Sequence, residues 1–223
     1  MKRTYTLFVA GLMYASGIHA ATITSVSADA TRGGNIALSW QGTTTTDYAG
    51  FIDVVMDGIY NRYTFCADIT TPISNTTYTT IFQSPSTIAN GLRAAWLVEN
   101  YAQTTTTVVG GQALQFAIWD IIHDGGDGLS KGNFRKASTT TAAVVTQATT
   151  YLSLSLGHTS TNAMLYVNTN VSTGAPGQTL ISWIPNDGGP QLTPEPASML
   201  FVGAGLAGIA ILARRKSKAP QVG

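Results

Sequence analysis

The stretch of residues 112–122 is the feature that most constrains what this chain can fold into. It has the length of a short helix, and its large apolar side chains, among them Leu114 and Phe116, cannot share one stripe. A helix that is apolar nearly all round is normally buried. Gln115 lies within it, and a buried amide must find hydrogen-bond partners or lose the free energy of its hydration. We therefore expect this helix inside the core, with a specific role for Gln115.

The first 20 residues have the pattern of a secretory signal peptide. Lys2 and Arg3 form a basic start, residues 6–17 are mostly apolar, and a small residue, Ala20, ends the segment. Signal peptidases cleave after small residues that follow such an apolar run. This order predicts that residues 1–20 are removed during export.

The C-terminal end of the sequence also has a recognisable pattern. A Pro-Glu-Pro tripeptide precedes an uncharged apolar run at 197–213, and a basic cluster follows the run. The tripeptide and the basic cluster consist of Pro194, Glu195 and Pro196, and of Arg214, Arg215 and Lys216. The apolar run has about the minimum length of a transmembrane helix, and basic residues mark the cytoplasmic side of a span. We expect a single membrane anchor at 197–213.

Residues 194–218 resemble the PEP-CTERM sorting signal of Gram-negative bacteria, which has this same order of tripeptide, span and basic cluster. The resemblance implies that an exosortase recognises the tripeptide in the membrane, cleaves nearby and passes the protein on. The destination implied is the cell surface or the extracellular matrix, where many such proteins accompany exopolysaccharide in biofilms. The membrane is a partner through the C-terminal helix until processing.

The remaining domain, residues 21–193, is acidic. It contains six basic and ten acidic side chains, a formal charge of −4, although the whole chain carries +1. A negative domain is repelled by nucleic acid and by anionic membrane surfaces. Nucleic acid is therefore excluded as a partner.

The order of expected elements predicts an α+β fold, an antiparallel β-sandwich or barrel with an inserted helical subdomain. We expect strands at 21–30, 35–41, 51–56, 59–66, 164–168 and 179–185, helices at 89–101, 112–122 and 131–156, and a loop or irregular strand at 67–83. Asp57-Gly58 is a strong signal for a type I′ hairpin turn. That hairpin would place Cys66 near the end of a strand.

Cys66 is the only cysteine of the chain, so it has no partner for an internal disulfide. Four interpretations remain open from the residues alone. The thiol is inert and buried, forms an intermolecular disulfide, is free and reactive, or is committed to another bond. A free cysteine is most often a small buried apolar residue.

Two short motifs, at residues 65–68 (Phe-Cys-Ala-Asp) and 114–119 (Leu-Gln-Phe-Ala-Ile-Trp), resemble the signature motifs of bacterial surface thioester domains. The resemblance implies an intramolecular thioester between the Cys66 sulfur and the Gln115 side-chain carbonyl, made by attack of a Cys66 thiolate. An apolar pocket would exclude water from this bond. Its expected residues are Phe65, Phe116, Trp119 and Trp96.

The function implied by this resemblance is adhesion, not enzymatic turnover. An amine on a surface or matrix protein would attack the thioester once and remain joined to Gln115. The alternative is a structural surface protein, associated with exopolysaccharide or the biofilm matrix, in which Gln115 is a structural amide bonded to backbone.

Other chemistry has little support. His123 and Asp124 precede a glycine-rich loop, a pattern that is typical of a helix end. Asp124 and Asp127 lack the remaining ligands of a calcium loop. The Gly-x-Ser-x-Gly, P-loop and dinucleotide-binding patterns are absent from the sequence. We expect no catalytic residue, no metal and no cofactor.

Overall fold

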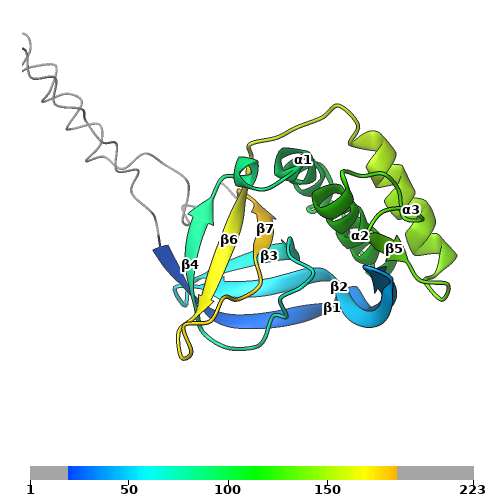
Figure 1. The fold of residues 1–223 in the computed structure, drawn as a ribbon. Helices are drawn as coiled ribbons and strands as arrows, with labels where there is room; N and C mark the ends of the chain where they lie inside the picture. The colour runs from blue at the N-terminus through cyan, green and yellow to red at the C-terminus, as the bar shows by residue number, and fades with distance from the viewer. Residues whose placement is uncertain (1–19, 185–223) are drawn as a thin grey trace, which may run out of the picture. The chain divides into compact units, whose positions relative to one another are not determined.

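A computed structural model describes residues 20–184 of the chain. Its elements are β1 (Ala20–Trp40), β2 (Thr43–Met56), β3 (Tyr60–Cys66), β4 (Tyr78–Gln83), the short 3₁₀ helix η1 (Pro85–Thr87), α1 (Gly91–Tyr101), α2 (Val108–Asp124), β5 (Phe134–Lys136), α3 (Ala142–Leu154), β6 (Ala163–Asn170) and β7 (Leu180–Trp183). Figure 1 shows the three α-helices gathered beside the strands. The chain thus returns to the sheet after forming the helical part.

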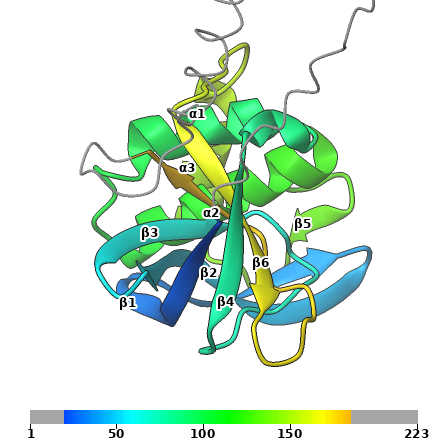
Figure 2. The same ribbon diagram turned by 90° about the vertical axis from the view of Figure 1, so that its left-hand side faces the viewer.

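The strands form one antiparallel sheet in the order β2-β3-β7-β6-β4-β1-β5. Because β1 also pairs with β2, six of the strands close into a ring, and β5 extends it along the end of β1. Figure 2 shows these strands from another side, with the helices running across one end. The antiparallel α+β class expected from the sequence is confirmed, and the sheet closes on itself as in a barrel.

The first two expected strands are one long strand, β1. Its pairing with β2 is interrupted between Ala28 and Gly33, where the register shifts. Such an irregularity bends a strand without ending it. Within it, the Arg32 guanidinium lies 2.5 Å from the Asp29 carboxylate and 4.1 Å above the ring of Phe51. The segment 31–34, which separated the two expected strands, is therefore part of a bulge within β1.

The hairpin between β2 and β3 forms where the sequence predicts it. Asp57 and Gly58 have φ values of +51° and +71°, as a type I′ turn requires at both central residues. The turn fixes the register in which β3 pairs with β2. Cys66 is consequently the last residue of β3, beside the core.

The segment 67–83, expected to be a loop or an irregular strand, contains strand β4, in which buried side chains alternate with more exposed ones. Two expectations about the helices were wrong. The expected helix at 131–156 is strand β5 followed by α3, because the chain first turns at Gly132, with φ +70°, and pairs with β1. The expected helix at 89–101 begins only at Gly91, since Asn90 has φ +55°.

Helix α2 is the centre of the domain, as its sequence predicts. Every residue from Gly110 to Ile122 is buried, and the helix contacts α1, α3 and four strands. Thr107 caps its start by accepting a hydrogen bond from the Gly110 N–H, and Gly125, with φ +73°, ends it. This placement sets the side chain of Gln115 inside the domain.

No helix within residues 20–184 is long and apolar enough to cross a membrane. The predicted signal peptide at 1–20, apart from its last residue, and the predicted span at 197–213 lie outside the described residues.

Candidate functional site

The side-chain amide of Gln115 lies against the backbone of Cys66 at the junction of α2 and β3. The Cys66 N–H donates to Gln115 Oε1 at 2.9 Å. Gln115 Nε2 donates to the Cys66 carbonyl oxygen at 2.8 Å. Two bonds to one residue fix both the position and the plane of the amide. The structure therefore brings together the two residues that the motifs single out, although 49 positions separate them in the sequence.

The Cys66 sulfur has a second amide beside it, that of Gln178. The thiol donates to Gln178 Oε1 at 3.0 Å, and Gln178 Nε2 donates to the Asp68 carbonyl oxygen at 2.9 Å. Asn168 Nδ2 in turn donates to the Gln178 carbonyl oxygen at 2.7 Å. Gln178 thus holds the thiol proton on the side of β7. Gln178 could not be predicted from the sequence, because a single glutamine in a loop carries no local signal.

Burial keeps the Cys66 thiol protonated. Cys66 and Gln115 are 4% and 0% exposed. Burial, with the carboxylate of Asp68 nearby, raises the pKa of the Cys66 thiol well above its usual range. The expected thiolate is therefore disfavoured in the folded protein, and any attack by this sulfur starts from the neutral thiol.

The raised pKa predicts slow alkylation of Cys66 wherever it is present as a thiol. Because the thiolate is the nucleophile, we expect iodoacetamide at pH 8 to modify Cys66 at least about tenfold more slowly in the folded chain than in the chain unfolded with guanidinium. The Gln115→Ala variant, which cannot form the proposed bond, is the suitable protein. Equal rates in the folded and unfolded chains would contradict a buried, protonated thiol.

A cavity of about 340 Å³ adjoins Cys66. Its lining includes the buried residues Cys66 and Trp119 and the exposed residues Asp47 and Thr70, so it leads from the surface to the sulfur. Trp119 Nε1 is a buried donor with no partner among residues 20–184. Buried donors are normally satisfied. This N–H is therefore an unused donor in a residue that lines the cavity.

The other expected pocket residues lie in different places. Phe65 and Phe116 are fully buried and pack against Phe51 and Phe134, with ring centroids 4.5 and 5.2 Å apart. Trp119 is the expected aromatic residue that lines the cavity beside Cys66. Trp96 lines a separate cavity and stacks on a histidine ring. The structure does not bring Trp96 to the cavity of Cys66.

Three aspartates at the C-terminal end of α2 form the one group among residues 20–184 that could hold a metal ion. Asp120, Asp124 and Asp127 do not line the cavity of Cys66. Burial, with the other two carboxylates nearby, raises the pKa of Asp120 to about 6. The adjacent His123 packs edge-on against Trp40, with ring centroids 4.8 Å apart.

Residues 192–216 match the family model described as the PEP-CTERM protein-sorting motif. The chain carries a PEP-CTERM sorting signal. The matched segment contains the tripeptide and the basic cluster recognised in the sequence, and it lies outside the described residues. A PEP-CTERM motif implies export, processing by an exosortase and a membrane-anchored sorting signal.

Two solved structures are similar to this chain at 12% identity. One is the N-terminal domain of the Streptococcus pyogenes pilus tip adhesin Cpa, with a TM-score of 0.42 over 73% of this chain and 99% of that chain. The other is the N-terminal thioester domain of the fibronectin-binding protein SfbI from Streptococcus pyogenes, with a TM-score of 0.38 over 70% of this chain and 95% of that chain. No curated protein matches the chain. The chemistry of the site is therefore argued from the geometry around Cys66.

Proposed function

We propose that this exported protein forms a thioester between Cys66 and Gln115 and uses it to attach covalently to an amine on a partner. The observation that carries the proposal is the reciprocal pair of hydrogen bonds between the Gln115 amide and the Cys66 backbone. The pair holds the amide next to the residue that bears the only thiol of the chain. Holding one reacting group beside the residue that carries the other lowers the entropic barrier to their reaction.

Two steps are required, and both balance without a redox partner. In the first, Cys66 Sγ bonds to the side-chain carbonyl carbon of Gln115, the C–N bond breaks, and the thiol proton leaves with the amide nitrogen as ammonia. In the second, an amine attacks the same carbon, an amide forms, and the sulfur leaves as the Cys66 thiol. The chain reacts once and does not turn over.

The contacts of Gln115 favour the first step. The Cys66 N–H points at Gln115 Oε1, where negative charge develops as sulfur adds to the carbonyl carbon. The thiol proton is directed to Gln178 Oε1, which leaves the sulfur lone pairs free to face elsewhere. Cys66 and Gln115 expose little surface, which limits competition by water even though the cavity reaches Cys66.

The same burial favours a bond that persists until a partner arrives. A thiol with a raised pKa is a poorer leaving group than an ordinary thiol, and the pKa of Cys66 is raised by burial. We infer that spontaneous hydrolysis is slow for this reason. Latency of this kind suits a protein that must be exported before it reacts.

The cavity suggests an amine that is attracted as its cation and attacks after losing a proton, such as a lysine side chain on a surface or matrix protein. Asp47 is an exposed carboxylate in its lining, Asp68 lies beside the sulfur, and the lining contains no basic residue. Negative charge at the entrance raises the local concentration of ammonium groups. Residence at the cell surface or in the matrix of a Gram-negative bacterium would supply such partners.

The test is the mass of the processed protein, purified from cells that export it and compared with the mass of its processed sequence, before and after treatment with methylamine. We expect a mass short by one ammonia, and then the gain of one methylamine. Trypsin separates the two residues into peptides 63–93 and 94–131. Methylamine should be found on peptide 94–131, and Cys66 should become open to alkylation after denaturation. The Cys66→Ala variant should show neither change.

The alternative function is a structural surface protein associated with exopolysaccharide, in which Gln115 only connects α2 to β3. The two hydrogen bonds of Gln115 to backbone would serve that role as well. A chain with the full mass of its sequence, and a thiol that alkylates after denaturation without methylamine, would favour this alternative and exclude the thioester.

A further inference from the structure

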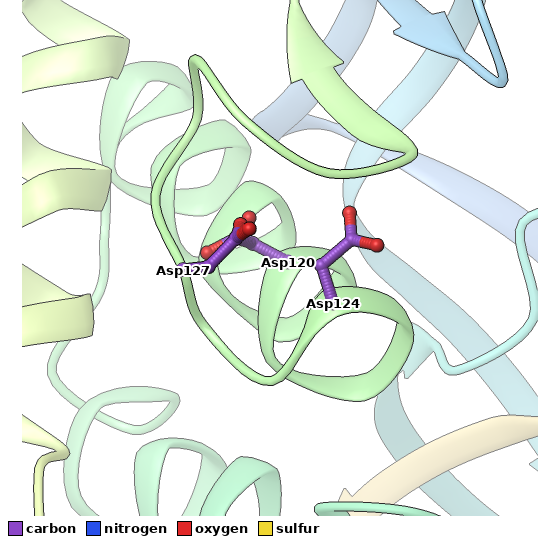
Figure 3. Close-up of side chains that lie close together, drawn as sticks. All are labelled: Asp120, Asp124 and Asp127. Atoms are coloured by element: carbon purple, nitrogen blue, oxygen red, sulfur yellow. The ribbon is translucent and has the colours of Figure 1, made fainter.

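Three carboxylates at the C-terminal end of α2 have no ion-pair partner within 4 Å among residues 20–184. One oxygen from each of Asp120, Asp124 and Asp127 lies within 4.8 Å of the others. Figure 3 shows the three side chains where the helix passes into the following loop, with the Asp124 carboxylate directed to the other side from those of Asp120 and Asp127 in this view. The end of a helix adds its own partial negative charge at the same place. A bound cation would reduce the electrostatic repulsion among these carboxylates.

An oxygen of Asp120 lacks the hydrogen bond that its burial requires. The Asp120 side chain is 0% exposed, and its Oδ2 accepts a hydrogen bond from the Gly128 N–H at 3.1 Å. Its Oδ1 is buried with no partner among residues 20–184. A buried carboxylate oxygen without a donor is costly. It is the observation that indicates a missing ligand, independently of the count of acidic residues.

Basic side chains nearby are already engaged. Arg93, on α1, is the cation that acts on Asp120. Its guanidinium donates to the Gly125 and Leu152 carbonyl oxygens and to Ser155 Oγ. The ion pairs within 4 Å in residues 20–184 involve Arg32 and lie elsewhere. The three carboxylates therefore have no ion-pair partner in the described chain.

We propose that Asp120, Asp124 and Asp127 bind a calcium ion. Calcium takes oxygen ligands at 2.3–2.6 Å, so two oxygens on opposite sides of one ion lie about 4.8 Å apart, the limit within which the three carboxylates are found. Asp124 still has lone pairs to offer, although its oxygens also accept from Phe134 N at 2.6 Å and Asn133 Nδ2 at 3.3 Å. Asp127 is exposed, so water can complete the coordination.

The bound ion would connect three parts of the chain. Asp120 and Asp124 are on α2, Asp127 is on the loop that follows it, and Asp124 also binds the start of β5 through Phe134. Calcium would thus hold the end of the central helix to the loop and to the sheet. In the sequence, Asp124 and Asp127 lack the further ligands of a calcium loop, and Asp120 lies within an otherwise apolar helix, so no metal site was expected here.

The test is the calcium dependence of thermal unfolding, with calorimetric titration of CaCl₂ into the full chain in detergent after removal of metal with EDTA. Extracellular calcium modules have dissociation constants on the order of 10⁻⁴ to 10⁻³ M. At about 10 mM CaCl₂, such affinity is expected to raise Tm by roughly 3–10 °C. MgCl₂ at the same concentration should have a much smaller effect.

Two variants and one control locate the site. Asp120→Asn and Asp127→Asn keep the shapes of the side chains and are expected to remove the calcium-dependent rise in Tm. Asp57→Asn, which changes an aspartate at the distant hairpin turn, should leave the rise intact. The proposal is overturned if the folded, unsubstituted chain shows neither heat nor a Tm change with CaCl₂. It is equally overturned if the two variants respond as that chain does, or if MgCl₂ acts as strongly as CaCl₂.

Discussion

Replacing Gln115 with alanine is expected to abolish the incorporation of methylamine, whereas Gln112→Ala should leave it intact. Both glutamines are buried on α2, one turn apart. Gln112 donates to the Gly34 carbonyl oxygen at 3.2 Å, and Gln115 is the one whose amide contacts Cys66. Without the Gln115 carbonyl no acyl group exists for the thiol. The measurement is the mass of peptide 94–131, which contains both positions, after treatment with methylamine.

Stability must be checked alongside, because Gln115→Ala leaves the Cys66 N–H and carbonyl without partners. We expect a loss of roughly 2–4 kcal/mol in the free energy of unfolding, which circular dichroism can follow. Cys66→Ala removes the thiol with a smaller loss and should abolish incorporation as well. Uptake of methylamine at Gln178 would contradict the assignment, since it would mean that the sulfur reacts with the amide it contacts in this structure.

Gly111→Ala is expected to be the most destabilising single methyl group that can be added to α2. A Cβ at Gly111 would lie 1.7 Å from the Arg32 carbonyl oxygen and 2.7 Å from its carbonyl carbon. Both atoms belong to the backbone of β1, so the helix must move away from the strand. We expect a loss of about 3 kcal/mol or more, despite the gain of about 1 kcal/mol in helix propensity.

Gly34→Ala, on the neighbouring strand β1, is the matched control. There the added Cβ would be 3.5 Å from the Gln112 amide nitrogen, an ordinary contact. We expect its effect to stay within about 1 kcal/mol. Denaturant unfolding of the two variants gives the comparison. Equal stabilities would show that α2 does not lie against β1 as closely as the structure has it.

The sequence predicted the parts of this fold that local chemistry determines. The type I′ turn at Asp57-Gly58 needs only two residues of the right kind, and α2 is recognisable because apolar residues surround Gln115 on all sides. Strand β5 could not be predicted in this way. Its three residues are held by pairing with β1, whose end lies about 100 positions earlier in the chain.

The residues of the candidate sites also fall into those that local sequence predicts and those that it does not. The pairing of Cys66 with Gln115 follows from two motifs, each readable within a few residues. Gln178 and Asp120 have no such motif, because their roles arise from what folding places beside them. Trp96 was expected at the site from its aromatic character alone, and it packs on His158 instead. The positions and roles of these three residues depend on contacts with parts of the chain that are distant in sequence, so local motifs could not predict them.

The place of β7 inside the closed sheet has a mechanical consequence. If Gln115 is joined to a partner and the chain is held through its C-terminal side, tension enters the domain on α2 and leaves it through β7. That strand is hydrogen-bonded to β3 on one side and to β6 on the other. Pulling on β7 must therefore break its hydrogen bonds to β3 and to β6 together. It cannot break the bonds to one neighbour alone, as it could for a strand at the edge of a sheet. Strands β1 to β4 precede Gln115 in the chain and lie outside this covalent path. They would support the stretched segments only through non-covalent contacts.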